Sequence, residues 1–282
     1  MSNVLITGAR SGIGRATALT LARSGHRVFA TMRGDSGDLT TIAGAESLPL
    51  TIHEMDVDSD ASVAACVAGI KENVDVLVNN AGVAPAGAVE ELPVSTFRAA
   101  METNYFGTVR CTQAVLPQMR ARRNGCLVNL SSVAGRVWCA PLTSYAAAKA
   151  AVEAFSEALA GEVKSFNIRV MLVEPGVIDT AMARDISRAQ SSTYPHTARF
   201  ARLFRAVLMQ PVPPEVVAAT IQDIVEGGTW VLRHTSGPTA VPFLAWRASM
   251  TDEEWIDFNS LDDARWYDRV LKDLGVDPRA VP

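Results

Sequence analysis

Apolar runs of strand length alternate with helix-length segments through the first 180 residues, and this alternation constrains the fold most strongly. The runs are apolar at consecutive positions, which is typical of parallel strands buried on both faces. Strands that alternate with helices predict a doubly wound α/β sheet. The six expected strands are NVLITG (3–8), HRVFATM (26–32), LPLTIHEMDV (48–57), VDVLVNNAG (74–82), GCLVNLSS (125–132) and NIRVMLVEPG (167–176).

Helices are expected near residues 12–24, 60–72 and 146–166, with one or two more between the fourth and fifth strands. A further helix begins near Pro213, and a last strand is expected at TWVLRH, residues 229–234. No repeat, low-complexity tract or linker divides the chain, so we expect a single α/β domain over residues 1–282 with a helical C-terminal extension. Its expected parts are a cofactor-binding and catalytic core (1–180), a substrate lid (181–210), and the last helix, strand and extension (211–282).

Composition and charge exclude several classes of function. The 282 residues carry a formal net charge of −4, which argues against broad contact with nucleic-acid phosphates. No apolar run is long enough to cross a bilayer and nothing before Val4 resembles a signal peptide, so we expect a cytoplasmic protein. The four cysteines form no C-x-x-C pair and the four histidines are scattered, so neither disulfides nor a metal site are expected.

A glycine-rich turn, TGARSGIG at residues 7–14, follows the first strand. Its glycines allow a tight turn and let a pyrophosphate approach backbone N–H groups at a helix N-terminus. The spacing G-x-x-x-G-x-G differs from the common dinucleotide fingerprint, and a plain strand-to-helix turn is the alternative. The position after the first parallel strand favours dinucleotide binding. The candidate contacts are Gly8, Arg10, Ser11, Gly12, Ile13 and Gly14.

Tyr145 and Lys149 stand four residues apart in LTSYAAAKAAVEAF, residues 142–155, so a helix places them on one face. An isolated pair with this spacing is usually an inert surface pair. A tyrosine phenol titrates near about 10, which is too high for efficient base catalysis near neutral pH. A nearby ammonium favours the phenolate and lowers that pKa, so the two residues can form an acid/base and its electrostatic partner.

The motifs TGARSGIG, NNAG, NLSS and YAAAK, in this order and at these separations, resemble those of the short-chain dehydrogenase/reductase family. The resemblance runs from about Val4 to Thr180 and continues more weakly through the helix near Pro213. It implies a Rossmann-like fold and oxidoreductase activity with a nicotinamide cofactor. The segments VFATMR, ETNYFGTVR and PGVIDTAM look most like the hydroxysteroid and retinol dehydrogenase branch, which implies a bulky apolar substrate.

The resemblance assigns the catalytic set to Asn104, Ser132, Tyr145 and Lys149. The family's spacing between serine and tyrosine selects Ser132 over the neighbouring Ser131. Ser132 would hydrogen-bond the substrate oxygen, Lys149 would also reach the ribose hydroxyls, and Asn104 would hold a water that links Lys149 to solvent. The chemistry is coherent, because a carbonyl reduced by hydride needs a proton donor within reach, here Tyr145.

The resemblance also outlines a cofactor groove. Asp56 and Val57, at the end of the third strand, match the residues of the family that contact the adenine ring. The segment EPGVIDT, residues 174–180, would border the nicotinamide. For NNAG, at residues 79–82, a purely structural turn is a serious alternative. The residues expected in this groove are Asp56, Val57, Asn80, Ala81, Gly82, Pro175, Gly176, Ile178 and Thr180.

The end of the second strand bears on the choice of cofactor. NAD-dependent proteins of this fold carry an acid there that binds both ribose hydroxyls. Here Met32 takes that position and Arg33 follows it. Arginine suits a 2′-phosphate by charge and by its planar donors, and Arg10 could approach the same group. We therefore predict NADP(H), with NAD(H) left open because Asp35 lies two residues further on.

Substrate selection is expected in the segments that flank the catalytic residues. VAGRVWCAP, residues 133–141, offers Val133, Trp138 and Cys139 as pocket walls. The lid over the substrate is expected at residues 182–204, beginning with Met182, and its mixture of apolar and hydroxyl residues suits a mobile flap.

The tail beyond Gly228 holds four of the five tryptophans, so we expect it to dock on the body and to narrow the pocket. Two of its helices are expected to open with capping boxes, Thr251 with Glu254 and Ser260 with Asp263. One apolar face of the second helix is formed by Trp266, Val270 and Leu274.

Together these features predict an NADP(H)-dependent oxidoreductase that interconverts a ketone and a secondary alcohol. Two alternatives stay open: a 3-oxoacyl thioester reductase, and an NADP(H)-sensing regulator that uses the fold without turnover. A serine hydrolase is excluded, because no G-x-S-x-G elbow surrounds Ser132. The resemblance further implies a homodimer or homotetramer formed through helices at residues 104–122 and 145–166.

Overall fold

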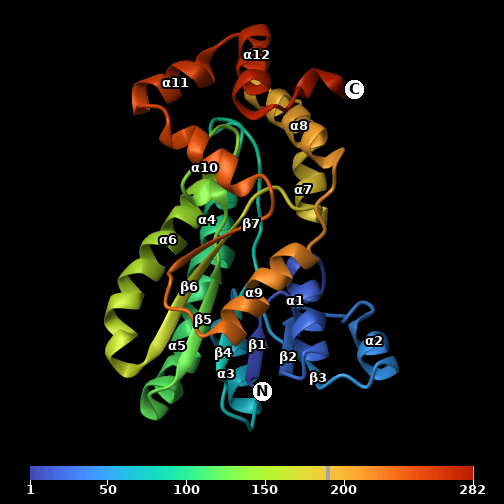
Figure 1. The fold of residues 1–282 in the computed structure, drawn as a ribbon, viewed down its shortest axis with the longest axis vertical. Coiled ribbons are helices and arrows are strands. Elements are labelled where there is room, and N and C mark those ends of the chain that lie inside the picture. Colours follow the sequence, from blue (N-terminus) through green and yellow to red (C-terminus); the bar gives the residue numbers. More distant parts are fainter. Residues whose placement is uncertain (189–190, 282) are drawn as a thin grey trace.

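Seven strands form one parallel sheet in the computed structural model, which describes residues 1–188 and 191–281 (Figure 1). The order of the strands in the sheet is β3-β2-β1-β4-β5-β6-β7. Strands β2 and β3 are added on one side of β1 and strands β4 to β7 on the other, so the order of addition reverses between β1 and β4. The predicted doubly wound α/β sheet is confirmed. The strands are β1 (Asn3–Ile6), β2 (Arg27–Met32), β3 (Leu50–Glu54), β4 (Val76–Asn79), β5 (Gly125–Leu130), β6 (Ile168–Pro175) and β7 (Arg233–Ser236).

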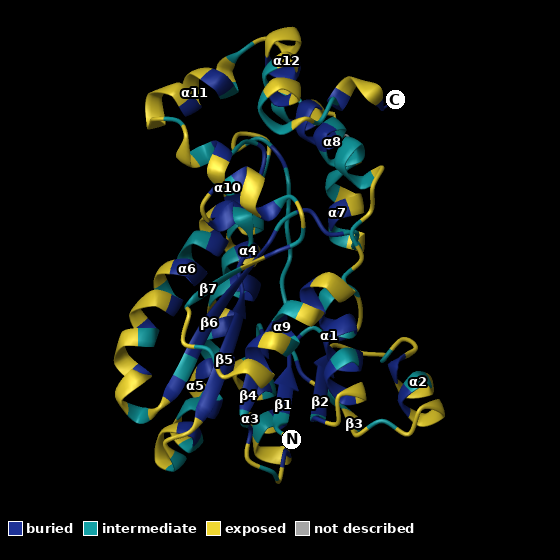
Figure 2. Ribbon diagram, viewed as in Figure 1, coloured by how far each residue is buried: buried dark blue, intermediate teal, exposed yellow. Residues whose placement is uncertain are grey.

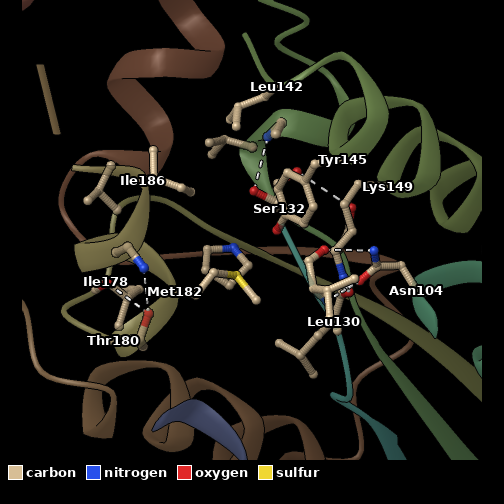
Figure 3. Close-up of a pocket in the computed structure, with 18 of the residues that line it drawn as sticks. Asn104, Leu130, Ser132, Leu142, Tyr145, Lys149, Ile178, Thr180, Met182 and Ile186 are labelled. Atoms are coloured by element: carbon tan, nitrogen blue, oxygen red, sulfur yellow. Dashed lines mark hydrogen bonds between the residues drawn. The ribbon is translucent and has the colours of Figure 1, made fainter. Parts of the chain in front are cut away.

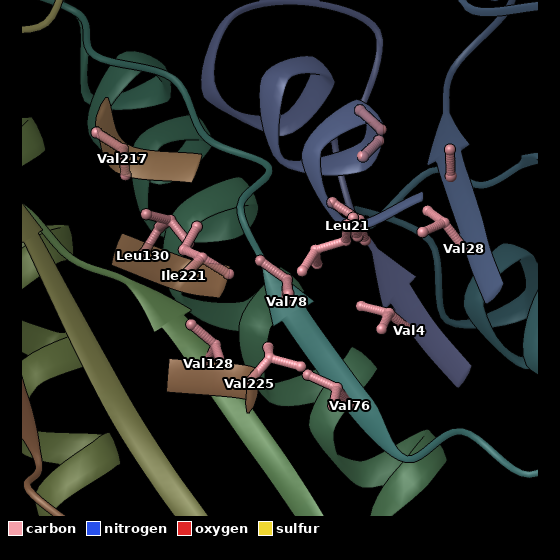
Figure 4. Close-up of a cluster of buried hydrophobic side chains, with 14 of the residues drawn as sticks. Val4, Leu21, Val28, Val76, Val78, Val128, Leu130, Val217, Ile221 and Val225 are labelled. Carbon is pink, nitrogen blue, oxygen red and sulfur yellow. The ribbon is translucent and has the colours of Figure 1, made fainter. Parts of the chain in front are cut away.

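Helices cover both faces of the sheet, and alternate side chains on each strand serve the two faces. On β1, Val4 and Ile6 pack beneath the helices of one face together with Leu21 and Ile221, whereas Leu5 packs on the other (Figure 4). One face is covered by α1 (Gly12–Arg23) and α9 (Glu215–Gly227), and the other by α3 (Asp60–Gly69), α5 (Gly107–Arg122) and α6 (Thr143–Val163). Burial on both faces explains the uninterrupted apolar runs of the sequence.

The remaining helices lie at the edge of the sheet or beyond the carboxyl ends of its strands. In the described ranges, no helix is long and apolar enough to span a membrane. The α-helices are α2 (Leu39–Ala45), α4 (Val94–Met101), α7 (Ala181–Ile186), α8 (Pro195–Leu208), α10 (Ala240–Ala248), α11 (Asp252–Ser260) and α12 (Asp263–Leu274). A π-helical turn (Glu102–Phe106) joins α4 to α5, and 3-10 turns span Val133–Gly135, Lys164–Phe166 and Pro278–Ala280.

Helices α8 and α10–α12 form an aromatic cap over the carboxyl ends of the strands (Figures 1 and 2). The ring of Trp246 lies 5.0 Å from that of Trp255 and 4.9 Å from that of Phe258. Trp266 stacks on Phe258 with 5.7 Å between centroids. The tail therefore docks on the body, as its tryptophan content predicted, and Trp266, Val270 and Leu274 pack inward as expected.

The last strand is displaced from its predicted position. TWVLRH was expected to form it, but β7 begins only at Arg233. Thr229 accepts a hydrogen bond from the Val231 amide on its hydroxyl and one from Arg169 on its carbonyl oxygen, so the chain turns there. Val231 is 60% exposed. The predicted start of this strand was wrong, because local polar contacts at Thr229 outweigh the β-propensity of the residues that follow.

One of the two predicted helix caps was also wrong. The Thr251–Glu254 capping box is present, with reciprocal hydrogen bonds of 2.8 and 3.2 Å. Ser260, however, is the last residue of α11, where its hydroxyl donates to the carbonyl of Ile256. Asp262 caps α12 instead, and its carboxylate accepts from the Arg265 amide at 2.9 Å. A carboxylate next to the helix start is a strong N-cap, so it displaces the serine.

Candidate active site

One cavity of about 460 Å³ lies where the carboxyl ends of the strands meet the aromatic cap. It is next to β1 and β4, the two strands between which the strand order of the sheet reverses. Ligands of open α/β sheets bind in such a crevice. Every residue that the sequence predicted for the catalytic set, the cofactor groove and the substrate pocket lines this cavity, except Gly14 and Trp138. Residues far apart in the chain are therefore brought into one site.

A buried amide ladder holds the catalytic helix against the sheet. Asn79 on β4 donates to the side-chain oxygen of Asn129 on β5 at 2.8 Å. Asn129 in turn donates to the hydroxyl of Ser156 on α6 at 2.8 Å. Because these groups are fully buried, the bonds fix the distance between α6 and the strands. Asn79 therefore helps to hold the central sheet together.

Tyr145 and Lys149 occupy successive turns of α6 and face the cavity (Figure 3). The Lys149 ammonium lies 5.7 Å from the centroid of the Tyr145 ring and donates to the carbonyl of Leu130 at 2.6 Å. Lys149 is only 5% exposed. The end of β5 thus anchors the ammonium beside the phenol.

Burial dominates the electrostatics of this pair. It lowers the pKa of Lys149 to about 8, while the nearby Glu153 carboxylate acts in the opposite direction. Burial also raises the pKa of Tyr145 above its usual value, and interaction with the Ser132 hydroxyl partly offsets this. The sequence led us to expect a lowered Tyr145 pKa, but desolvation of the phenolate outweighs the ammonium here. The phenol therefore carries its proton at neutral pH.

Ser132 stands just beyond the end of β5 and caps the 3-10 turn that follows. Its oxygen accepts from the Ala134 amide at 3.1 Å, which fixes the side chain beside Tyr145 (Figure 3). The neighbouring Ser131 is buried and its hydroxyl faces its own chain. Of the two serines, Ser132 is the one that interacts with the phenol.

Asn104 lies in the π-helical turn and ties it to the segment after NNAG. Its amide nitrogen donates to the carbonyls of Val83 (2.9 Å) and Ala100 (2.8 Å), and its amide oxygen accepts from the Val83 amide (3.1 Å). Both hydrogens of the amide nitrogen are therefore used within the chain. A water held by Asn104 stays a prediction, and it would have to bind another atom of this residue.

The glycine turn is packed tightly against β4. Asn80 donates to the carbonyls of Thr7 and Gly8 at 2.9 and 3.1 Å, which joins the ends of β4 and β1. A Cβ atom on Gly14 would lie 2.3 Å from the Asn80 amide nitrogen and 2.4 Å from the Gly8 carbonyl. Gly14 therefore serves the close packing of this turn and does not line the cavity, whereas Gly8 and Gly12 do.

Two arginines border the cavity beside β1 and β2. Arg33 is 64% exposed and its guanidinium lies 3.8 Å from carboxylate oxygens of both Asp56 and Asp58. Arg10 forms an ion pair of 3.0 Å with Asp35. Asp35, the acid that left NAD(H) open, is engaged by Arg10 and does not line the cavity. Both arginines thus lie close to carboxylates at this end of the cavity.

The substrate side of the cavity is mostly apolar. Val133, Cys139 and Met182 line it as expected. Trp138 does not: it is 55% exposed and its indole N–H donates to the carbonyl of Gly135 at 3.0 Å. Val137, one residue earlier, faces the cavity instead. The 3-10 turn at Val133–Gly135 rotates the chain before these residues. The side chain of Val137 therefore faces the cavity, and that of Trp138 does not.

The aromatic cap contributes a further part of the wall, which was not assigned residue by residue from the sequence. The concentration of tryptophan in the tail was the available signal, but it named no individual residue. The aromatic residues that line the cavity are Phe200, Phe204, Phe243, Trp246, Trp255, Phe258 and Trp266. Residues 189 and 190 of the expected lid lie outside the described residues.

Comparison with known proteins shows what this architecture is similar to. The family model described as short chain dehydrogenase matches residues 2–191. Retinol dehydrogenase 8 of Bos taurus is 39% identical over 266 residues, which cover 87% of this chain and 84% of that protein. A 3-ketodihydrosphingosine reductase of Bacteroides thetaiotaomicron is 37% identical over 243 residues, covering 83% of this chain and 87% of that protein.

Solved structures agree with the sequence comparison. A tryptophan-substituted variant of actinorhodin polyketide ketoreductase, solved with NADPH, superposes with a TM-score of 0.75 at 30% identity. The match covers 85% of this chain and 97% of the ketoreductase.

Proposed function

The chain belongs to the short-chain dehydrogenase family and is an oxidoreductase that acts on CH–OH or C=O groups, and we propose that it interconverts a bulky apolar ketone and a secondary alcohol with NADP(H). One observation carries this proposal. A single cavity joins the Ser132, Tyr145 and Lys149 side chains to an arginine-bordered groove at one end and to an aromatic wall at the other.

In the reducing direction, the protonated phenol of Tyr145 donates its proton to the substrate oxygen. Ser132 hydrogen-bonds the same oxygen as negative charge develops on it. The Lys149 ammonium stabilises the phenolate that Tyr145 leaves behind. When bound, NADPH supplies the hydride to the carbonyl carbon. In the oxidising direction the phenol first loses its proton, the resulting phenolate of Tyr145 accepts the proton of the alcohol, and the same two neighbours hold the oxygen and the charge.

The preference for NADP(H) is supported by the charge at the end of β2. Arg33 and Arg10 would contact a 2′-phosphate, and Met32 offers no carboxylate to the ribose hydroxyls. Gly8, Gly12 and the first turn of α1 would receive the pyrophosphate. Lys149 would contact the nicotinamide ribose from the other side of the groove.

An apolar substrate is supported by the residues of the cap and of the expected lid. Met182, Ile186 and Phe204, from α7 and α8, face the catalytic residues across the cavity, and we propose that residues 181–210 act as the substrate lid. The two relatives named above act, by their names, on retinol and on 3-ketodihydrosphingosine, which supports an apolar substrate.

We further propose a cytoplasmic homo-oligomer that pairs α5 and α6 with their counterparts. The exposed face of α6 carries the small residues Ala147, Ala154 and Ala158, which allow close approach of a second helix. Light scattering coupled to size exclusion tests this, and a monomer at micromolar concentration contradicts it.

The decisive experiment titrates the protein with NADPH and with NADH by fluorescence and screens ketones for NADPH consumption in the same plate. We expect tighter binding of NADPH and turnover of bulky ketones. Tyr145→Phe should lower kcat by about 10²- to 10⁴-fold, because it removes the acid/base group. Tyr105→Phe, at a tyrosine that does not line the cavity, is the matched control.

Each other outcome selects an alternative. Turnover of a phosphopantetheine 3-oxoacyl thioester in preference to free ketones would favour the thioester reductase. Tight NADPH binding without turnover across chemically diverse carbonyls would favour the NADP(H)-sensing regulator. Preference for NADH would overturn the role proposed for Arg33 and leave the catalytic residues in place.

A further inference from the structure

A cluster of two buried carboxylates and two partly exposed arginines lies next to Lys149 but outside the cavity. Glu153 follows Lys149 by one turn of α6, and its carboxylate accepts from Arg233 of β7 at 3.0 Å. Glu174 of β6 lies 3.4 Å from Arg136 and 3.7 Å from the same Arg233. None of the four charged residues around Lys149 lines the cavity. The cluster therefore contacts the catalytic helix from the side that substrate cannot reach.

The two carboxylates of this cluster are shielded from water. The side chains of Glu153 and Glu174 are 8% and 1% exposed, and among the described residues one oxygen of each has no hydrogen-bond partner. A buried charge is costly unless a compensating charge lies near it. Such groups are unusual in a fold whose core needs only apolar residues, so their presence beside a catalytic ammonium calls for an explanation.

The four charges of the cluster balance one another, because Glu153 and Glu174 contribute two negative charges and Arg136 and Arg233 two positive ones. Glu157 also bonds Arg233, but it is exposed, so water and salt screen its charge. Lys149 adds a positive charge one helical turn from Glu153, and among the described residues one oxygen of Glu153 has no hydrogen-bond partner.

The stem of Glu153 also touches the turn that follows Ser132. A Cβ atom on Gly135 would lie 3.0 Å from the Glu153 Cγ, 2.8 Å from the Ser131 hydroxyl and 3.3 Å from the Lys149 carbonyl. Only a glycine lets the turn approach α6 this closely. Glu153 therefore packs from the helix of Tyr145 and Lys149 against the turn that follows Ser132.

We propose that Glu153, held by Arg233, is a positioning residue that keeps the buried Lys149 in its cationic form beside the Tyr145 phenol. The proposal rests on the function proposed above, because it concerns the same acid/base group. Burial lowers the pKa of Lys149, which is about 8 with the opposing charge of Glu153 in place. Without Glu153, the ammonium would lose its proton at a lower pH.

The charged and titratable groups around Lys149 come from every element packed against it. Glu153 and the exposed Glu157 lie on α6, Glu174 on β6, Arg233 on β7 and Arg136 in the turn after Ser132. On the cavity side the neighbour is the Tyr145 phenol. The nearest of the acids on the helix of Lys149, and the one that acts on its charge, is Glu153.

The direction of the pH effect follows. Ketone reduction requires a proton on Tyr145 and a positive charge on Lys149. Both are present well below pH 8, and the charge on Lys149 is lost as the pH rises through about 8. Glu153→Gln removes the group that raises this midpoint, so the loss of activity should begin at a lower pH.

The test follows Lys149 directly by NMR of protein labelled with carbon-13 at the lysine side chains. The chain has four lysines, and the three others, Lys71, Lys164 and Lys272, are exposed and serve as internal references. The Lys149 signal is assigned by its absence in Lys149→Arg. In Glu153→Gln we expect the titration midpoint of Lys149, the pH at which its signal has shifted halfway, to fall by about one pH unit. The reductase pH profile should shift by the same amount, with kcat reduced and the ketone KM unchanged.

Glu157→Gln is the matched control, because Glu157 bonds the same Arg233 at 2.6 Å but is 64% exposed. It should leave the Lys149 midpoint where it is in the wild type. Arg233→Met should move the midpoint upward, since it removes a cation and leaves the carboxylates. This second variant keeps the test informative if Glu153→Gln fails to fold, which circular dichroism detects.

An unchanged Lys149 midpoint in folded Glu153→Gln, or a downward shift in Arg233→Met, would overturn the proposal. The titration needs no substrate, so it separates this inference from the proposed function. If the wild type reduces no ketone, the proposed function fails while the NMR midpoints still decide the role of Glu153.

Discussion

The two walls of the cavity are built on different principles. The core wall consists of polar groups at strand ends, and close backbone contacts fix them, such as that of Gly14 with Asn80 and Gly8. The cap wall consists of large rings from four helices that pack mainly on one another. A small displacement would disable the first wall, because proton transfer depends on hydrogen-bond distances. The second wall can change shape and still exclude water.

Hydrogen bonds at a few positions couple the two walls. The indole N–H of Trp255 donates to the carbonyl of Trp138 at 2.7 Å, in the loop between Ser132 and Tyr145. The Val177 amide donates to the hydroxyl of Thr239, just before α10, at 2.9 Å. The cap also meets the core through apolar packing around Val137, Leu142 and Val177. Chemistry and substrate selection can therefore be disturbed separately, except where such hydrogen bonds join the walls.

The largest effect is expected from a change in the core wall that adds one methyl group. Gly14→Ala would force the Gly8 carbonyl or the Asn80 side chain out of place, and overpacking of this kind costs about 1–3 kcal/mol. We expect NADPH affinity to fall by about 10- to 100-fold, measured by fluorescence titration. Gly161→Ala, in α6 with no atom within 4 Å of the added Cβ, should leave binding unchanged. Equal NADPH affinity in both variants would contradict the packing account of the turn.

A smaller effect is expected from a charge at the mouth of the core wall. Arg33→Ala should weaken NADPH binding by about tenfold or more and leave NADH binding nearly unchanged, because a hydrogen bond to a charged group contributes about 1.5–3 kcal/mol. Arg23→Ala, which removes an exposed arginine paired with Glu46 outside the cavity, is the control. A parallel loss for both cofactors would show that Arg33 acts on the fold of the groove and not on a 2′-phosphate.

The smallest effect tests the coupling of the walls. Trp255→Phe keeps an aromatic ring and removes the donor to the Trp138 carbonyl, a bond that contributes about 1 kcal/mol. We expect the KM for a bulky ketone to rise about fivefold while the Kd for NADPH stays constant. Trp230→Phe, outside the cavity, is the control. If NADPH binding fell as far as ketone binding, the two walls could not be treated as separate.

The same contrast explains how much could be predicted from the sequence. Residues of the core wall are adjacent to strand ends, so the apolar runs and short motifs placed Ser132, Asn80 and Thr180 in the cavity. Residues of the cap wall reach the cavity only through contacts between distant segments, and helical spacing alone does not say which ring faces inward. Local errors had local causes, as at Thr229, where a turn delays β7.

Three features could not be predicted from the sequence: the short helix α2, the direction of the Tyr145 pKa shift and the ion pair of Glu153. Helix α2 was not predicted, because it buries only Leu39 and Ala43 and so has almost no apolar periodicity. The raised Tyr145 pKa depends on the competition between desolvation and a neighbouring charge, and residue spacing does not indicate which of them is larger. Arg233, the partner of Glu153, comes from β7, far from it in the chain.

The π-helical turn at residues 102–106 determines where the helix that follows it can tolerate a deleted residue. A π-helical turn accommodates one extra residue within an α-helix. Beyond it, α5 turns Cys111, Val115 and Met119 toward the sheet, and Asn104 bonds Val83. Deleting one residue from the turn would let the α-helix continue without the bulge, so the apolar stripe of α5 would still face the sheet, but the bulge that holds Asn104 against Val83 would be lost. Deleting one residue within α5 itself would rotate the residues after it by about 100° and turn the stripe away from the sheet. The helix can therefore absorb a change of length at the π-helical turn but not beyond it.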